Sequence, residues 1–363
     1  MIAKQAVAGK RLMASEKGRE STSMNSAERV HVALRGGQPD RVPVMEFLLD
    51  ERVARRAVPG CKDSADCMDR LGMDGVGCGA EFGKTRENPD GTFVDEWGVT
   101  YRPGLEMVAH PIHGPIRTMA DAQAYRAPDP AAPNRLGKLP ELAKRYKGKR
   151  AISFHQRAAF MWSAYLMDID GMLMNLLAEP ELVTVVMDKV LEANIAVARR
   201  AIRAGAEVVI LGDDYAHNHG PMMSPALFKE FILPRLKTMV DAIHEEGALC
   251  VKHSDGNLYP ILDMIVSAGP DGLNPIEPVA GMELGKTRKL VGRRLCLIGN
   301  IDCSRLLPYG TPAEVREAVR QAIAEAAPGG GFIVSSSNSF HSSCRPENLK
   351  AMVDATHEFG RYA

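Results

Sequence analysis

Short apolar runs recur along the chain, and each ends in polar or small residues before a stretch whose apolar positions have helical spacing. Eight such runs are visible, at residues 41–47, 74–79, 150–155, 207–214, 249–256, 271–278, 294–302 and 331–339. Strands that alternate with helices predict βα units and a parallel sheet. Eight units predict an α/β fold of the (β/α)8 (TIM) barrel type. A doubly wound open sheet is the alternative, and the lack of a Gly-rich phosphate turn after the first run disfavours it.

The helices between these runs carry recognisable start residues. A long segment with apolar residues at helical spacing begins at Pro180, and two others follow the N-cap residues Ser224 and Thr311. Regular spacing at the start of the chain begins only after the first two dozen residues. We therefore expect residues 1–23 to be a disordered extension and residues 24–363 to form a single barrel domain.

The second connection is much longer than the others and predicts an inserted β-hairpin. The segment "FGKTRENPDGTFVDEWGVTYRPG" contains a Pro-Asp-Gly turn with alternating flanks, which places the hairpin at about residues 84–104. Insertions at the carboxyl-terminal face of a barrel often shape a lid over the site. The hairpin is therefore a candidate lid.

Composition and charge narrow the classes of function. Hydrophobic residues make up 45% and charged residues 25% of the chain, as in ordinary globular proteins. Lys+Arg and Asp+Glu both number 45, so no basic excess indicates a nucleic-acid partner. No apolar run approaches the roughly 20 residues that span a membrane, and the first residues lack the apolar core of a secretory signal. Seven cysteines without a C-x-x-C spacing predict a reduced, cytoplasmic protein.

Polar residues gather at the carboxyl-terminal ends of the predicted strands, where barrel enzymes place their chemistry. They are Glu46, His155, Gln156, Asp213, Asp214, His253, Asp255, Asn274, Glu277, Asn300, Asp302, Ser337 and Asn338, with His341 and Cys344 just beyond. Carboxylates crowded on one rim repel one another, and a bound cation or polar substrate would relieve that repulsion. The alternative is a purely structural rim of helix caps. An imidazole, several carboxylates and a thiol suit zinc or another divalent metal.

The stretch "LCVKHSDGNLYP" (249–260) holds the strongest pair of candidates. Because side chains alternate along a strand, His253 and Asp255 are predicted to face the same way. Glu277 ends the adjacent sixth strand, close enough in a barrel to converge with them. We predict a divalent metal site, zinc, held by His253, Asp255 and Glu277. The alternatives are an acid–base pair of His253 and Asp255 without metal, or a core histidine beside a helix-capping aspartate.

Several longer stretches together resemble the uroporphyrinogen decarboxylase superfamily over residues 24–363. They are "ERVHVALRGGQPDRVPV", "GDDYAHNHGPMMSPALFKEF", "HSDGNLYPILDMIVSAGPDGLNPIEP", "IGNIDCSRLLPYGTPAEV" and "PENLKAMVDA". The resemblance implies a (β/α)8 barrel, in agreement with the strand pattern. It also implies one of two chemistries, porphyrinogen decarboxylation or corrinoid-linked methyl transfer.

Three departures disfavour the decarboxylase branch. The arginine-rich motif that follows the first strand in decarboxylases, similar to "MRQAGR", is absent from the corresponding "MEFLLDERVARR", although this segment contains Arg52, Arg55 and Arg56. The histidine of the decarboxylases' Gly-His-Gly turn aligns with Asn338. Their Asp-Ser-Trp pattern at the fourth strand is replaced here by Asp213, Asp214 and Tyr215.

The methyltransferase branch fits better. Members that act on coenzyme M bind zinc through His-x-Cys and a distant Cys, which align here with His253, Asp255 and Asn338. Both thiolates are missing, so the chain resembles the demethylating members, which pass a methyl group from a methoxylated aromatic or similar donor to Co(I) of a separate corrinoid protein. The chain has no Asp-x-His-x-x-Gly cobalamin signature, so we expect a corrinoid protein partner that docks over the barrel mouth. Relatives are commonly homodimers, and we expect a homodimer here.

The resemblance and the chemistry of ether cleavage assign roles to the rim. The predicted catalytic residues are Asp214, His253, Asp255 and His341, with Asp214 or His341 supplying a proton. Substrate contacts are predicted for Glu46, His155, Asp213, Tyr215, Asn274 and Asn338. Cys344 is a candidate for the missing metal ligand, the alternative being a loop thiol without a role. The alternative functions are a cofactor-free decarboxylase of a tetrapyrrole or other carboxylated small molecule, and a non-catalytic barrel that binds a ligand as a sensor.

Overall fold

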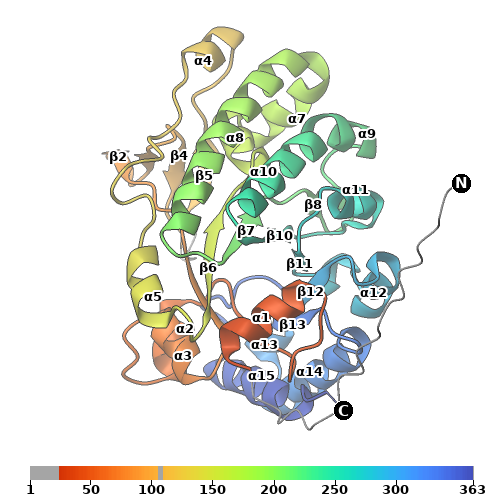
Figure 1. Ribbon diagram of the computed structural model, residues 1–363. Helices are drawn as coiled ribbons and strands as arrows, with labels where there is room; N and C mark the ends of the chain where they lie inside the picture. The colour runs from red at the N-terminus through yellow and green to blue at the C-terminus, as the bar shows by residue number, and fades with distance from the viewer. Residues whose placement is uncertain (1–23, 105–108, 363) are drawn as a thin grey trace, which may run out of the picture.

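The computed structural model describes residues 24–104 and 109–362, and its architecture is a parallel barrel surrounded by helices (Figure 1). The predicted disordered extension, residues 1–23, lies outside the described residues. Seven parallel strands form one curled sheet in the order β1-β6-β7-β10-β11-β12-β13. Their bounds are β1 (Gly75–Gly79), β6 (Ala151–Gln156), β7 (Val208–Gly212), β10 (Leu249–His253), β11 (Gly272–Asn274), β12 (Cys296–Ile301) and β13 (Phe332–Ser336). Each strand lies within a predicted run, give or take a residue at its end, and the predicted fold class is confirmed.

The first predicted run joins the two edges of this sheet without forming a regular strand. On one side, the N–H of Met45 donates to the carbonyl of Val334 at 3.0 Å, and the N–H of Val334 donates to the carbonyl of Pro43 at 2.9 Å. On the other side, the N–H of Asp74 donates to the carbonyl of Val44 at 2.8 Å. Pro43 has no N–H to contribute to a ladder, which limits the pairing to isolated bridges.

Alternate residues of the strands fill the interior of the barrel. The apolar part of this interior consists of Met45, Phe47, Ala151, Val208, Ile210, Leu249, Val251, Cys296, Ile298 and Ile333, together with Val30, Ala33 and Leu34. The last three belong to helix α1 (Ser26–Leu34), which contacts β1, β6 and β13 and covers one end of the barrel. Because side chains alternate along a strand, the inward position that follows Val251 is His253, at the carboxyl end of β10.

Helices surround the sheet, and their start residues match those expected. The Ser224 hydroxyl accepts the N–H of Leu227, and Thr311 forms a capping box with Glu314. Helices α8 and α10 pack together, as do α14 and α15 (Figure 1). The helices after α1 are α2 (Glu51–Ala57), α3 (Ser64–Arg70), α4 (Met119–Ala124), α5 (Leu139–Tyr146), α6 (Phe160–Met167), α7 (Ile169–Ala178), α8 (Pro180–Arg203), α9 (Pro225–Leu227), α10 (Leu233–Glu245), α11 (Leu262–Ser267), α12 (Leu284–Val291), α13 (Leu306–Tyr309), α14 (Pro312–Ala326) and α15 (Pro346–Phe359). Among the described residues, no helix combines the length and the apolar character needed to cross a membrane.

The insertion after β1 is a four-stranded antiparallel sheet. Its strands, in spatial order, are β2 (Lys84–Glu87), β3 (Phe93–Asp95), β4 (Thr100–Arg102) and β5 (His110–His113). The predicted hairpin is present as β2 and β3, and two further strands extend it. Aromatic packing attaches this sheet to α6, since Trp97 stacks on Trp162 with ring centroids 4.7 Å apart.

Candidate active site

A cavity of about 720 Å³ lies between the carboxyl-terminal ends of the barrel strands and the inserted sheet. Five of the predicted site residues line it, namely His155, Asp214, His253, Asp255 and Asn338. The inserted sheet contributes Phe93, Asp95 and Tyr101 to the opposite part of the lining. The insertion therefore forms part of the wall of the cavity, as expected of a lid.

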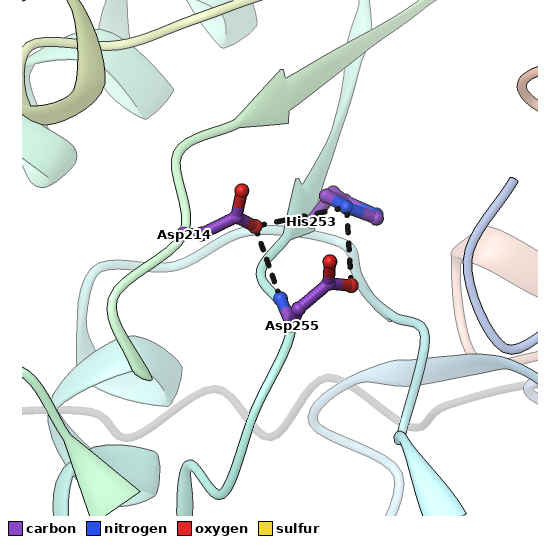
Figure 2. A group of neighbouring side chains, drawn as sticks. All are labelled: Asp214, His253 and Asp255. Atoms are coloured by element: carbon purple, nitrogen blue, oxygen red, sulfur yellow. Dashed lines mark hydrogen bonds and ion pairs between the residues drawn. The ribbon is translucent and has the colours of Figure 1, made fainter. Parts of the chain in front are cut away.

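Asp214, His253 and Asp255 form a compact cluster in this lining (Figure 2). His253 ends β10, Asp255 lies in the loop that follows it, and Asp214 lies in the loop after β7. The Nε2 atom of His253 lies 3.8 Å from Asp214 Oδ1 and 3.5 Å from Asp255 Oδ1. The N–H of Asp255 also donates to Asp214 Oδ1 at 3.1 Å, which holds the two loops together.

Asn274 orients the imidazole of His253. The Nδ2 group of Asn274 donates to the carbonyl of Ile298 at 3.2 Å, so its Oδ1 is the acceptor that faces His253 Nδ1 at 2.5 Å. The Nδ1 atom of His253 therefore carries a hydrogen. In the neutral ring, the Nε2 lone pair then points toward the two carboxylates, where it can accept a proton or bind a metal.

The surroundings of the Asp255 side chain favour binding of a proton or a cation to its carboxylate. Burial raises its pKa to about 6, and the charges of Asp214 and Glu277 act in the same direction, against the opposing effects of His253 and Asn338. Its Oδ2 accepts the side-chain amide of Asn338, whereas its Oδ1 is buried and has no hydrogen-bond partner among the described residues. A buried carboxyl oxygen without a partner is a suitable position for a proton or a metal ion.

The surroundings of Asp214 instead favour its ionised form. Burial acts to raise its pKa, but the charge of His253, the Asp255 N–H and the charges of Arg157 and Lys252 outweigh burial and lower the pKa. Lys252 is fully buried, and its Nζ donates to the carbonyls of Leu211 at 3.1 Å and Asp213 at 2.6 Å. Burial lowers the pKa of Lys252 to about 8. Sequence reasoning missed this lysine because it faces away from the barrel interior.

The cluster fits a divalent metal. One ligand atom from each of Asp214, His253 and Asp255 lies within 4.8 Å of the other two. One imidazole nitrogen with two carboxylate oxygens is a donor set found for zinc and other divalent ions. Glu277, the third predicted ligand, is not in this group, and its Oε2 accepts the N–H of Gly256 at 2.7 Å. Asp214 is the third member of the group instead.

The structure does not bring Cys344 and His341 to the cluster. Cys344 is 1% exposed within the apolar core, and burial, followed by the neighbouring Cys303, raises its thiol pKa to about 12. The Nε2 atom of His341 lies 2.9 Å from the carbonyl oxygen of Cys303, and neither residue lines the cavity. Cys344 therefore replaces no missing ligand here, and His341 is engaged with the backbone.

Four predicted substrate contacts lie beneath the cavity surface rather than on it, namely Asn274, which bonds to His253, and three others. Glu46 is 1% exposed, accepts the Ser336 N–H at 2.6 Å and its hydroxyl at 2.8 Å, and has a pKa raised by burial to about 8. Asp213 is fully buried and accepts the backbone N–H groups of residues 159–161 at the start of α6. Tyr215 is 1% exposed and packs among aromatic rings. These residues support the elements that form the site.

Sequence reasoning also missed part of the cavity lining. Arg157 directly follows β6 and lines the cavity together with the aromatic residues Phe82, Tyr101, Trp162 and Tyr165. A polar residue just after a strand run is the signal that identified Asp214, and it applies equally to Arg157. His155, at the end of the same strand, lies in this lining with a pKa lowered to about 4 by burial and then by His253.

A TIM barrel with an ionisable cluster at the carboxyl-terminal ends of its strands has the design of an enzyme. Residues 98–359 match the uroporphyrinogen decarboxylase (URO-D) family, and the chain belongs to that family. A uroporphyrinogen decarboxylase of Trichlorobacter lovleyi is 26% identical over 270 residues, which cover 71% of this chain and 75% of the relative. One of Alkalilimnicola ehrlichii is 31% identical over 188 residues, which cover 50% of this chain and 48% of the relative.

A solved structure has a fold similar to that of this chain. The structure of a methyltransferase from Methanosarcina mazei superimposes with a TM-score of 0.76, covers 93% of this chain and 99% of its own, and is 20% identical. At this identity the likeness concerns the fold, which agrees with the barrel described above.

Proposed function

We propose that this protein moves a methyl group from a small aryl methyl ether to the Co(I) corrinoid of a partner protein. The observation that carries the proposal is the placement of two atoms in the lining of a cavity with aromatic walls. They are His253 Nε2 and the Oδ1 of Asp255, which has no hydrogen-bond partner within the described part of the chain. The aromatic residues suit the ring of the donor. The polar cluster suits the ether oxygen, where negative charge develops.

The chemistry requires such a cluster. The bond between the methyl carbon and the ether oxygen breaks, Co(I) supplies the electron pair of the new methyl–cobalt bond, and the oxygen keeps the pair of the broken bond. A phenolate is a poor leaving group, so a proton or a cation at the oxygen stabilises the developing charge. Asp255, with its pKa raised to about 6, can hold that proton in mildly acidic solution, and the ionised Asp214 and His253 Nε2 lie beside it.

A divalent metal held by Asp214, His253 and Asp255 would supply the same stabilisation as a Lewis acid. Asn274 would then act as a positioning residue, since it turns the His253 Nε2 lone pair toward the carboxylates. Whether the cluster works with a proton or with a metal, it acts at the ether oxygen. The corrinoid protein and a second copy of the chain remain predicted partners.

The arginines of the first connection support methyl transfer over porphyrinogen decarboxylation. Arg52, Arg55 and Arg56 lie on the exposed side of α2, and none of them lines the cavity. Arg52 and Arg55 contact the acidic residues Asp50 and Glu51 of their own segment. They are therefore placed away from a substrate bound in the cavity.

The test mixes the protein with a Co(I) corrinoid protein and a panel of methoxyaromatics, and follows methyl-Co(III) by its absorbance. We expect methyl-Co(III) with at least one donor, and a decrease of about 100-fold or more for Asp255→Asn. The matched control is Asp263→Asn, because the side chain of Asp263 is 92% exposed. Turnover of uroporphyrinogen with no methyl-Co(III) across the panel would overturn the proposal.

A further inference from the structure

Arg157 is a half-buried cation in the cavity lining. It follows β6, and its side chain lies against the aromatic rings of α6, with the guanidinium carbon 5.7 Å from the centre of the Trp162 ring and 5.0 Å from that of Tyr165. Such packing holds the planar guanidinium in place. It is therefore a fixed positive charge within a largely aromatic part of the wall.

The hydrogen-bonding capacity of Arg157 is only partly used. A guanidinium offers five N–H donors. One Arg157 nitrogen donates to the carbonyl of Gly212 at 2.7 Å and another to the Tyr165 hydroxyl at 3.3 Å. Across residues 24–104 and 109–362, no carboxylate oxygen lies within 4.0 Å of the guanidinium nitrogens of Arg157. By contrast, the buried Arg135 beside the inserted sheet forms an ion pair with Glu96.

The acids near Arg157 are already engaged. The charges of Asp213 and Asp214 act on Arg157. Asp213 accepts the backbone N–H groups of residues 159–161, and Asp214 accepts the Asp255 N–H and faces His253. A half-buried cation without a carboxylate partner is expected to bind an anion from the ligand, and a planar guanidinium matches a carboxylate. The two carboxylates of the acid–histidine cluster repel an anionic group, which favours binding of that group at Arg157.

We propose that Arg157, together with the Tyr165 hydroxyl, forms a subsite for the carboxylate of a methoxylated aromatic acid. The ring then lies against Trp162 and the aromatic residues of the inserted sheet, and the ether oxygen points toward His253 and Asp255. The inference rests on the proposed methyl transfer for the position of the ether, and it narrows the donor from any aryl methyl ether to one that carries a carboxylate.

Calorimetric titration of the full chain, without corrinoid protein, tests the subsite. The probes are 2-, 3- and 4-methoxybenzoate, each paired with the uncharged methoxybenzamide of the same pattern. For at least one pair, we expect the wild-type protein to bind the benzoate with a Kd at least tenfold lower than that of the amide. Arg157→Gln should bring the two Kd values within about twofold of each other, chiefly by weakening benzoate binding.

Two controls keep the result interpretable. Arg56→Gln removes an exposed arginine of α2 and should retain the full preference for the benzoate. If Arg157→Gln does not fold, Arg157→Lys replaces it in the test. This variant keeps the charge but loses the planar fork of the guanidinium, so it should retain only part of the preference for the benzoate. Equal binding of benzoate and amide by the wild-type protein, no binding of any benzoate, or a preference that survives in a folded Arg157→Gln variant would overturn the subsite. Benzoate binding without methyl transfer would instead reject the proposed function and keep the subsite.

Discussion

His253 and Asn274 are joined by a hydrogen bond of 2.5 Å between Nδ1 and Oδ1, and this contact decides which imidazole nitrogen faces the cavity. The two residues end neighbouring strands, β10 and β11, which are paired in parallel with His253 opposite Asn274. The register of the barrel therefore sets the orientation of the ring. Because Asn274 is fully buried, it acts on the chemistry through His253.

Replacement of Asn274 by Leu should weaken metal binding at the cluster without leaving a cavity in the barrel core. Leu has a similar size but cannot accept the Nδ1 hydrogen, so the ring loses its fixed tautomer. Zinc affinity, measured by competition with a chromogenic chelator, should fall about 10- to 100-fold. Unchanged zinc affinity in a folded Asn274→Leu variant would show that the contact does not orient a ligand.

Replacement of His253 by Ala should abolish metal uptake. His253 supplies the single nitrogen of the donor set, and without it the two carboxylates are left to bind the ion alone. Elemental analysis after metal-replete purification measures the stoichiometry. His341→Ala is the matched control, because this half-buried histidine lies outside the cluster. Equal metal content in His253→Ala and wild-type protein, or full activity of wild-type protein after thorough chelation, would leave the acid–base pair as the explanation.

Replacement of Glu46 by Gln should change how stability depends on pH. The carboxyl has an ordinary pKa of 4.5, which burial raises to about 8 in the folded protein. Between these values the unfolded chain is ionised at this position while the folded chain keeps the proton. The stabilisation is therefore complete below pH 4.5 and is lost as the pH rises through 8, at up to about 1.4 kcal/mol per pH unit.

The amide introduced by Glu46→Gln would keep a hydrogen bond to Ser336 without titrating, so this variant should become more stable relative to wild type as the pH rises. Urea denaturation at pH values between the two pKa values gives the free energies of unfolding. Parallel pH dependence in the two proteins would contradict the buried protonated form.

Replacement of Asp213 by Ala should destabilise the barrel. The carboxylate accepts three backbone N–H groups at the start of α6, which also carries Trp162 and Tyr165 of the cavity wall. Removing it leaves buried amides without partners, at a cost of about 2 kcal/mol or more, measured by urea denaturation. Asp213→Asn should lose less stability, because its amide oxygen can still accept backbone N–H groups. A variant with weakened substrate binding and unchanged stability would instead indicate the direct substrate contact expected from the sequence.

The sequence alone determined the barrel and its helix caps, and it pointed to the strand ends where the candidate site lies. Strand alternation, helical spacing and N-cap residues depend on neighbouring positions, so they can be read without knowing the contacts between distant segments. The same local rule placed His253 on the inner face, at the carboxyl end of β10. It also predicted the first hairpin of the insertion from its turn residues.

The tertiary structure decided which side chains meet. Asp214 rather than Glu277 joins His253 and Asp255 in the cluster, because the loops after β7 and β11 place only the Asp214 carboxylate beside His253. Asp213 differs from Asp214 by one position, yet it caps α6 beneath the cavity surface. Cys344 is likewise buried in the core. Positions just after a strand no longer follow the alternation, so their direction depends on loop conformation and on contacts between residues far apart in the chain.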